Sequence, residues 1–189
     1  MIIYKCIICD DEMFSDTFKV TVSKSGIFYE VEGKAVTRTE GFDEKLISAN
    51  ASADEMTEGT DSTSVSGVDI VLNHKLQETF YNKKAYLTHM RTYVKAVKAK
   101  LQETNPDRVD AFVVDVQKEV GDIVKNMSKY QFFTGESMDP DGMVGLLNYR
   151  EDEITPYMLF FKDGLLIEKC VSTLLQIHTK HHEVFFLLL

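Results

Sequence analysis

Two adjacent amphipathic helical patterns, over residues 82–127, constrain the fold of this chain more than any other feature of its sequence. In the first pattern, apolar residues recur at spacings of three and four: Leu87, Met90, Val94, Val97 and Leu101. In the second, the same spacings link Phe112, Val113, Val116, Val120, Ile123, Val124 and Met127. Asn105-Pro106-Asp107 separates the two patterns with a stop, a capping residue and a proline suited to a first helical turn. Because this connection is so short, we expect the two helices to pack antiparallel as a hairpin.

Much of the remaining sequence follows strand patterns. Phe18, Val20 and Val22 alternate with polar neighbours, which is the period-two pattern of a half-buried strand. Turns such as Ser25-Gly26 divide residues 1–36 into short segments, which we interpret as a meander. Further strands are predicted over 68–72, 130–134, 144–149 and 156–161, with a last one ending near Cys170. The chain is therefore expected to be an α+β protein, mainly β, into which the helical hairpin at 82–127 is inserted.

Residues 39–67 differ in composition from the segments on either side. Between Glu40 and Asp61 there are seven acidic residues and one basic residue, with few apolar residues to anchor the segment. Such a segment does not bury enough apolar area to offset the entropy that ordering would cost. We therefore expect a single domain over residues 1–170 with a mobile acidic loop at 39–67, followed by a poorly ordered extra tail at 171–189.

The charge of the chain narrows its function class. Its 189 residues carry a formal net charge of −9, whereas proteins that bind nucleic acid through its phosphates need a dominant basic surface. We therefore expect no nucleic-acid partner. The N-terminal segment reaches Asp10-Asp11-Glu12 before any apolar stretch of the kind found in a cleavable signal peptide. The sequence also contains no run of about 18 apolar residues, the length that a membrane-spanning helix needs. The expectation is a cytoplasmic protein without stable membrane insertion.

The three cysteines are too few, and odd in number, for a disulfide framework. Cys6 and Cys9 have the spacing of half a zinc site, but tetrahedral zinc needs two more ligands and the only other cysteine is Cys170. In a strand, side chains three residues apart point to opposite faces. We therefore interpret the pair as ordinary strand cysteines.

A cluster of carboxylates, Glu136, Asp139 and Asp141, could attract calcium, a cation that prefers several oxygen ligands. An EF-hand loop starting at Asp139 would have Asp141 at its third position, but Met143 and Arg150 would fall at positions five and twelve, which need oxygen ligands. The sequence predicts at most a weak calcium site near these three carboxylates, and no required cofactor.

No catalytic motif is evident in the sequence. The segment around Ser137 lacks the second glycine of a nucleophile elbow, and glycine-rich phosphate or dinucleotide motifs are absent. We therefore expect a binding protein rather than an enzyme.

One side of the first predicted helix is basic, with Lys84, Arg91, Lys95 and Lys98 at helical spacings. Such a face is commonly solvated surface. Against an acidic net charge it would also suit a negatively charged protein partner, such as the acidic tails of tubulin. Both interpretations stay open on the sequence alone.

Several stretches occur in a particular order along residues 1–170. They are Met1-Ile2-Ile3-Tyr4, Asp11–Asp16, Asn50–Ala53, Gly67–Val71, Leu76–Thr79, Tyr130–Met138, Pro140-Asp141-Gly142, and Thr155–Gly164 through Glu168-Lys169-Cys170. Together they resemble the translationally controlled tumour protein family. The resemblance implies a β-tent fold like that of small GTPase-binding chaperones, with an inserted helical hairpin.

The resemblance also implies functions and sites. It implies an interaction protein of growth control that binds calcium, microtubules and a small GTPase such as Rheb. A groove of Glu12, Leu76 and Glu136 would contact the GTPase, residues 77–121 would contact tubulin, and Ser62 would be a phosphorylation site. Alternative roles are anti-apoptotic binding of Bcl-family proteins, an extracellular histamine-releasing role after unconventional secretion, and chaperone-like binding.

The residues themselves bear on two of these implications. Glu12 and Glu136 lie at turns that flank strands, and a carboxylate at such a position avoids a large desolvation cost only if it is exposed. Leu76 would supply an apolar contact between them. The segment that corresponds to the family's Bcl-binding region, residues 17–23, is rich in β-branched residues and predicts a strand rather than a docking helix.

Overall fold

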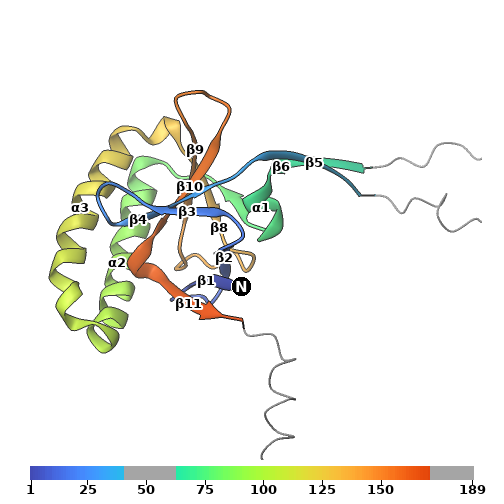
Figure 1. Cartoon of the computed structure of the whole chain (residues 1–189). Coiled ribbons are helices and arrows are strands. Elements are labelled where there is room, and N and C mark those ends of the chain that lie inside the picture. The colour runs from blue at the N-terminus through green and yellow to red at the C-terminus, as the bar shows by residue number, and fades with distance from the viewer. Residues whose placement is uncertain (41–62, 171–189) are drawn as a thin grey trace, which may run out of the picture.

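The computed structural model describes residues 1–40 and 63–170, which form antiparallel sheets and a helical hairpin (Figure 1). One sheet has the strand order β11-β1-β2, with bounds β11 (Leu165–Lys169), β1 (Ile2–Cys6) and β2 (Glu12–Ser15). A larger sheet has the order β3 (Lys19–Val22), β4 (Phe28–Glu32), β10 (Pro156–Phe161), β9 (Gly145–Tyr149), β8 (Gln131–Thr134) and β7 (Gln77–Thr79). A two-stranded ribbon pairs β5 (Ala35–Glu40) with β6 (Thr63–Val68) and extends away from the other sheets.

The N-terminal strands divide between two sheets, so the meander predicted over residues 1–36 is wrong between β2 and β3, although β1 pairs with β2 and β3 pairs with β4. Strand β1 pairs with β2 and β11, whereas β4 pairs with β3 and with the distant β10. Aromatic packing explains the division, because Phe14 of β2 stacks on Tyr4 of β1 and on Phe160 of β10 with ring centroids 4.3 and 4.8 Å apart. The small sheet therefore shares its core with the large one.

The segment predicted as a strand over 68–72 is mostly a short helix, α1 (Asp69–Asn73). The Asp69 carboxylate accepts hydrogen bonds from the backbone N–H groups of Lys34 and Ile70, at 2.8 and 2.9 Å, and so satisfies a donor of the first turn. A short apolar run does not by itself distinguish a strand from a buried helical turn. The prediction failed for that reason.

The loop predicted over 39–67 is wrong at both of its ends, residues 39–40 and 63–67, which lie in strands. Strand β6 begins at Thr63 and pairs along its length with β5, which ends at Glu40. The rest of the predicted loop and the predicted phosphorylation site Ser62 lie outside the described residues, as does the tail at 171–189.

The helical hairpin is present as predicted. It consists of α2 (Lys83–Thr104), a 3₁₀ turn η2 (Pro106–Arg108) and α3 (Val109–Lys125), followed by a second 3₁₀ turn η3 (Met127–Lys129). The side chain of Asn82 caps α2 by accepting a hydrogen bond from the Ala85 N–H at 2.8 Å. The two helices lie side by side along one flank of the molecule (Figure 1).

The buried face of α2 differs from the predicted apolar stripe. Tyr86, His89 and Tyr93 are buried along with Met90, Val97 and Leu101, whereas Leu87 is 37% exposed and Val94 is partly buried. Stripe arguments count only aliphatic residues, but here tyrosine and histidine rings fill the space between the helix and the sheet. The helix is therefore rotated relative to the prediction.

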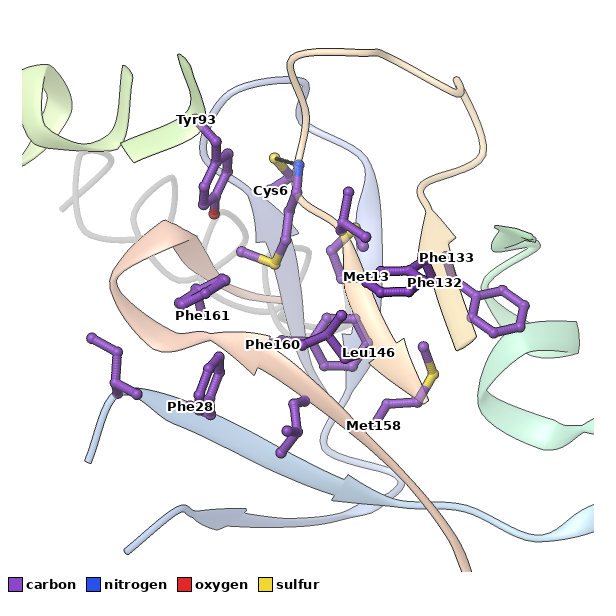
Figure 2. Packing of buried hydrophobic residues seen from close by; sticks show 14 of the residues in the cluster. Cys6, Met13, Phe28, Tyr93, Phe132, Phe133, Leu146, Met158, Phe160 and Phe161 are labelled. Atoms are coloured by element: carbon purple, nitrogen blue, oxygen red, sulfur yellow. Dashed lines mark hydrogen bonds between the residues drawn. The ribbon is translucent and has the colours of Figure 1, made fainter. Parts of the chain in front are cut away.

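The core lies between the large sheet, the small sheet and the hairpin (Figure 2). Phe160 and Phe161 of β10 point to different neighbours: Phe160 stacks on Phe14, and Phe161 contacts Phe28 and Tyr93, with ring centroids 4.6 and 6.0 Å apart. A 3₁₀ turn, η4 (Lys162–Gly164), then leads from β10 into β11. The fold is thus mixed α+β and mainly β, as predicted.

One negative result concerns membranes. Within residues 1–40 and 63–170, the helices are too short or too polar to cross a bilayer.

Candidate functional site

Three successive residues between α1 and β7 organise the predicted Glu12–Leu76–Glu136 surface. Helix α1 ends with the N–H of His74 donating to the Ile70 carbonyl at 3.2 Å and the N–H of Leu76 donating to the Val71 carbonyl at 3.0 Å. Between them Lys75 has a φ of 52°, the left-handed conformation that commonly closes a helix. As a result His74 and Leu76 are buried, while Lys75 is exposed.

The first predicted carboxylate, Glu12, reaches His74. Its Oε1 atom lies 2.9 Å from His74 Nδ1, with the Glu12 side chain 43% exposed and the His74 side chain only 5% exposed. The carboxylate lies close to the ring nitrogen but outside good hydrogen-bond geometry, so neither His74 nitrogen has a well-directed partner. Burial lowers the pKa of His74, and the Glu12 charge opposes that shift only in part.

The second predicted carboxylate, Glu136, reaches the next residue of the same connection. Its Oε1 atom accepts a hydrogen bond from Lys75 Nζ at 2.8 Å, and this contact raises the pKa of Lys75. Both side chains are exposed, 61% for Glu136 and 66% for Lys75. The pair is therefore an exposed ion pair, a type of contact that contributes little to stability.

A further contact holds the Glu136 loop against the turn that precedes β2. Asp11 accepts two hydrogen bonds from Ser137, one from its backbone N–H at 3.3 Å and one from its hydroxyl at 2.6 Å. Asp11 precedes Glu12 in the chain, and Ser137 follows Glu136. The two predicted carboxylates are thus brought to one surface by contacts between residues far apart in sequence.

Leu76 lies beneath this surface rather than on it. It is 5% exposed, and its side chain forms part of the wall of a groove beside the β5–β6 ribbon, together with Val36, Val71, Phe133 and Leu147. A partner on the Glu12–Glu136 surface would meet at most the edge of Leu76. The polar residues His74 and Lys75, which the sequence reasoning did not select, are the ones that lie beside the two carboxylates.

The predicted calcium cluster forms a turn. The Asp139 Oδ1 atom accepts the N–H of Asp141 at 2.8 Å, and the Asp139 carbonyl accepts the N–H of Gly142 at 3.1 Å. In the part of the chain that the structure describes, no three histidine, cysteine or carboxylate side chains are grouped as metal ligands. A cation near Glu136, Asp139 and Asp141 would therefore need backbone oxygens or water among its ligands.

The four predicted basic residues of the hairpin all lie on α2 and are exposed. Within the described residues, none of them is part of an ion pair. Three of them, Arg91, Lys95 and Lys98, line an open groove between α2 and α3. The floor of that groove is apolar, with Leu87, Met90, Val94, Val113, Val116 and Val120. The surface is thus a basic margin beside an apolar strip.

The cysteine pair differs from its prediction. Cys6 is the last residue of β1, but Cys9 lies in the following turn. Because Cys9 is outside the strand, the rule that places side chains three apart on opposite faces does not apply, and the interpretation of both as strand cysteines is wrong for Cys9.

Comparison with known proteins identifies the family. The family model described as translationally controlled tumour protein matches residues 1–166. The chain belongs to this family. Homologues of translationally controlled tumour protein from Lateolabrax japonicus and Danio rerio are 68% and 63% identical to it, and the protein from Homo sapiens is 54% identical. Each alignment covers 90% of this chain and 100% of the relative.

Solved structures of the family share the fold. The translationally controlled tumor-associated protein p23fyp from Schizosaccharomyces pombe superimposes with a TM-score of 0.74 at 42% identity, covering 90% of this chain and 100% of that chain. The protein from Caenorhabditis elegans gives a TM-score of 0.65 at 32% identity, covering 91% and 100%. The resemblance to the translationally controlled tumour protein family and the predicted α+β fold are both confirmed.

Proposed function

We propose that this protein is a non-enzymatic interaction protein that binds a small GTPase, of the Rheb type, through the surface around Glu12 and Glu136. One observation carries the proposal: Glu12 and Glu136 contact two successive residues, His74 and Lys75, of a single connection. Both carboxylates are exposed, and the hydrogen bonds between their chain neighbours Asp11 and Ser137 hold their two segments together. Family membership supplies the choice of a GTPase as the partner.

The chemistry of the surface suits a partner with cationic side chains. Glu136 is already in an exposed ion pair with Lys75, and exchanging such a pair for one with a partner costs about 0–1 kcal/mol. Glu12 lies beside His74, whose pKa is lowered by burial, so the charge of Glu12 is not matched by a strong base. Asp11 and Ser137 hold the two segments together, so little ordering is needed on binding. The buried Leu76 supports the connection from below.

A binding titration with a purified small GTPase tests this proposal. Glu12→Val and Glu136→Gln should each lower the affinity about tenfold or more, because each removes a charge from the contact. Glu103→Gln, an exposed carboxylate of α2, is the matched control and should leave the affinity unchanged. Unchanged affinity in both surface variants, with folding intact by circular dichroism, would refute the assignment.

A second candidate function is microtubule binding by the hairpin. The exposed bases beside the α2–α3 groove oppose the sign of the whole protein, and acidic tails such as those of tubulin have the complementary charge. Reversing Lys84, Arg91, Lys95 and Lys98 to glutamate should reduce co-sedimentation with microtubules, and added salt should weaken binding of the unchanged protein.

The control for this experiment comes from α3 and from η3, the turn that follows it. Lys118 and Lys129 are exposed and lie outside the groove lining, so reversing them removes a similar kind of charge elsewhere on the hairpin region. Equal losses for the two sets would indicate a nonspecific charge effect, and no loss for either would leave the basic face as solvated surface.

Weak calcium binding near Glu136, Asp139 and Asp141 belongs to the same proposal. Asp139→Asn and Asp141→Asn are expected to remove calcium-dependent amide shifts in a nuclear magnetic resonance titration.

Family resemblance alone supports the remaining expectations: cytoplasmic location with unconventional secretion, a role in growth control, and anti-apoptotic, histamine-releasing or chaperone-like activities. Strand β3 occupies the region that corresponds to the Bcl-binding segment, so binding there would add a strand rather than dock a helix.

A further inference from the structure

Cys6 and Cys9 occupy one helical-type turn at the end of β1. The N–H of Asp10 donates to the Cys6 carbonyl at 2.9 Å, and Asp10 closes the turn with a φ of 62°. The N–H of Cys6 also donates to the Asp11 carbonyl at 2.8 Å, which fixes both ends of the turn. Side chains three residues apart in such a turn lie on the same side, with Cβ atoms about 5–6 Å apart. A disulfide needs about 3.5–4.5 Å, so a modest adjustment of the turn joins the two sulfurs.

The sulfur of Cys6 is surrounded by hydrogen-bond donors although its side chain is only 1% exposed. It accepts the N–H of Met143 at 3.3 Å and the N–H of Ile8 at 3.4 Å. Interaction with the Cys9 thiol and these backbone donors lower the pKa of Cys6 to about 6, against the opposing effect of burial. The two backbone donors therefore favour the thiolate form of Cys6.

The neighbouring thiol, Cys9, is the accessible member of the pair. It is partly exposed, and its S–H donates to the Asp11 Oδ2 atom at 3.3 Å. Its interaction with Cys6 raises the pKa of Cys9, because the two sulfurs share one proton. Asp11 is an acceptor for that proton in direct contact.

Two other roles account less well for this arrangement. A tetrahedral metal ion would need two further ligands, and in the described part of the chain Cys6, Cys9 and Asp11 are not grouped so that they could hold a metal ion. A cysteine that only fills space behaves as a small apolar residue. That role suits the burial of Cys6, but it leaves the partial exposure of Cys9 and its contact with a carboxylate unexplained.

We propose that Cys6 and Cys9 are a reversible redox pair that forms an intrachain disulfide by exchange with a low-molecular-weight disulfide such as oxidised glutathione. The Cys9 thiol passes its proton to Asp11 and then to water, and the Cys9 sulfur attacks one sulfur of the reagent. The reagent's S–S bond breaks, one thiolate leaves, and a mixed disulfide forms on Cys9. The Cys6 thiolate then attacks the Cys9 sulfur and expels the second thiolate. Two cysteines are oxidised by two electrons and one reagent disulfide is reduced to two thiols.

The test uses the full chain with Cys170→Ser, because Cys170 is exposed and would form bonds between molecules. After equilibration with oxidised glutathione at pH 7 and acid quenching, free thiols are alkylated in denaturant and counted by mass spectrometry. We expect two alkylated thiols in the reduced protein and none in the oxidised protein. The oxidised protein should stay monomeric and carry no bound glutathione, and reduction should restore both thiols. Two surviving thiols, a stable mixed disulfide or a linked dimer would each overturn the proposal.

Single-cysteine variants in the same background identify the attacking thiol. With Cys6→Ser, the remaining Cys9 should accumulate as a glutathione adduct, whereas with Cys9→Ser the buried Cys6 should stay unmodified. Circular dichroism confirms that each variant is folded, and the parent's thiol count tests the disulfide independently of them. The reverse pattern would contradict the assignment of Cys9.

The role of Asp11 has its own matched pair. Asp11→Asn keeps the shape of the side chain but removes the proton acceptor, and it should slow oxidation about tenfold or more. Ser137→Ala removes the hydroxyl hydrogen bond to Asp11 but keeps the Asp11 carboxylate and the bond from the backbone N–H at position 137, so its oxidation rate should match that of the parent. Equal rates for Asp11→Asn and the parent would exclude Asp11 as the acceptor.

Discussion

The guanidinium group of Arg108 donates to both carboxylate oxygens of Asp163, with nitrogen–oxygen distances of 3.0 to 3.2 Å. Arg108 ends the connection between α2 and α3, and Asp163 lies in the turn between β10 and β11. The Asp163 side chain is 10% exposed, so the contact is shielded from solvent on one side. This contact fastens the tip of the helical hairpin to the sheets.

Replacement of Asp163 by alanine should destabilise the fold by about 1.5–3 kcal/mol, the usual size of a well-formed hydrogen bond to a charged group. Arg108 retains a weaker contact with Asp115 at 3.5 Å, which favours the lower part of that range. Chemical denaturation of the single variants Asp163→Ala and Arg108→Ala and of the double variant measures the coupling. Strictly additive losses would mean that the contact does not stabilise the fold.

Substitution of two glycines by alanine should have effects of opposite sign. A Cβ atom at Gly164 would overlap the hydroxyl oxygen of the buried Tyr93 and lie 2.8 Å from the Met143 Cε atom, so Gly164→Ala should cost about 1–3 kcal/mol. A Cβ atom at Gly121, within α3, meets no atom within 4 Å. Gly121→Ala should therefore stabilise the protein by about 0.5–1 kcal/mol. Thermal or urea unfolding measures both, and a stabilising Gly164→Ala would contradict the packing described here.

Stability should fall as the solution is acidified from pH 7 to pH 5. Burial lowers the pKa of His74 and of His89 below the ordinary value of 6.5. Near and below pH 6.5 the unfolded chain therefore binds protons that the native protein does not. The free energy of unfolding decreases as the pH falls from there to the native pKa values of the two histidines. Urea unfolding across this range should show a shallower pH dependence in His74→Gln and in His89→Gln. An unchanged slope in both variants would contradict the burial effect.

Removing the Glu12 charge should lower the pKa of His74 further. The carboxylate opposes the effect of burial on that imidazole, so Glu12→Gln leaves burial unopposed. A nuclear magnetic resonance titration of the His74 ring measures the change. Glu136→Gln is the control, because Glu136 pairs with Lys75 instead. A rise of the His74 pKa in Glu12→Gln would show that the two groups do not interact as described.

Local patterns were enough to predict the hairpin and most strands. The repeats of three and four in residues 82–127, with Asn105 and Pro106 between them, specify two helices before any tertiary contact forms. The same patterns misplaced the buried face of α2, because Tyr86 packs on Phe132 and Tyr93 packs on Phe161, both of which belong to the sheet. Apolar content predicts burial, but ring packing decides which side is buried.

The candidate sites required the tertiary structure. Glu12 and Glu136 were selected by the family resemblance, but no sequence pattern indicated their neighbours His74 and Lys75. The side chains of His74 and Lys75 point in different directions because Lys75 has a left-handed backbone conformation, which depends on how α1 ends. The Cys-x-x-Cys spacing was visible, but whether the two side chains diverge or converge depended on β1 ending at Cys6.

The amino-acid sequence alone specifies the net charge, the family resemblance and most of the secondary structure. Most helices and strands could be predicted because they depend largely on residues near one another in the chain. Strand order, the joining of Asp11 to Ser137 and the convergence of two cysteines depend on contacts between distant segments or on where an element stops. Those outcomes reflect competition between whole packing arrangements, whose free energies differ by contacts that no local pattern contains.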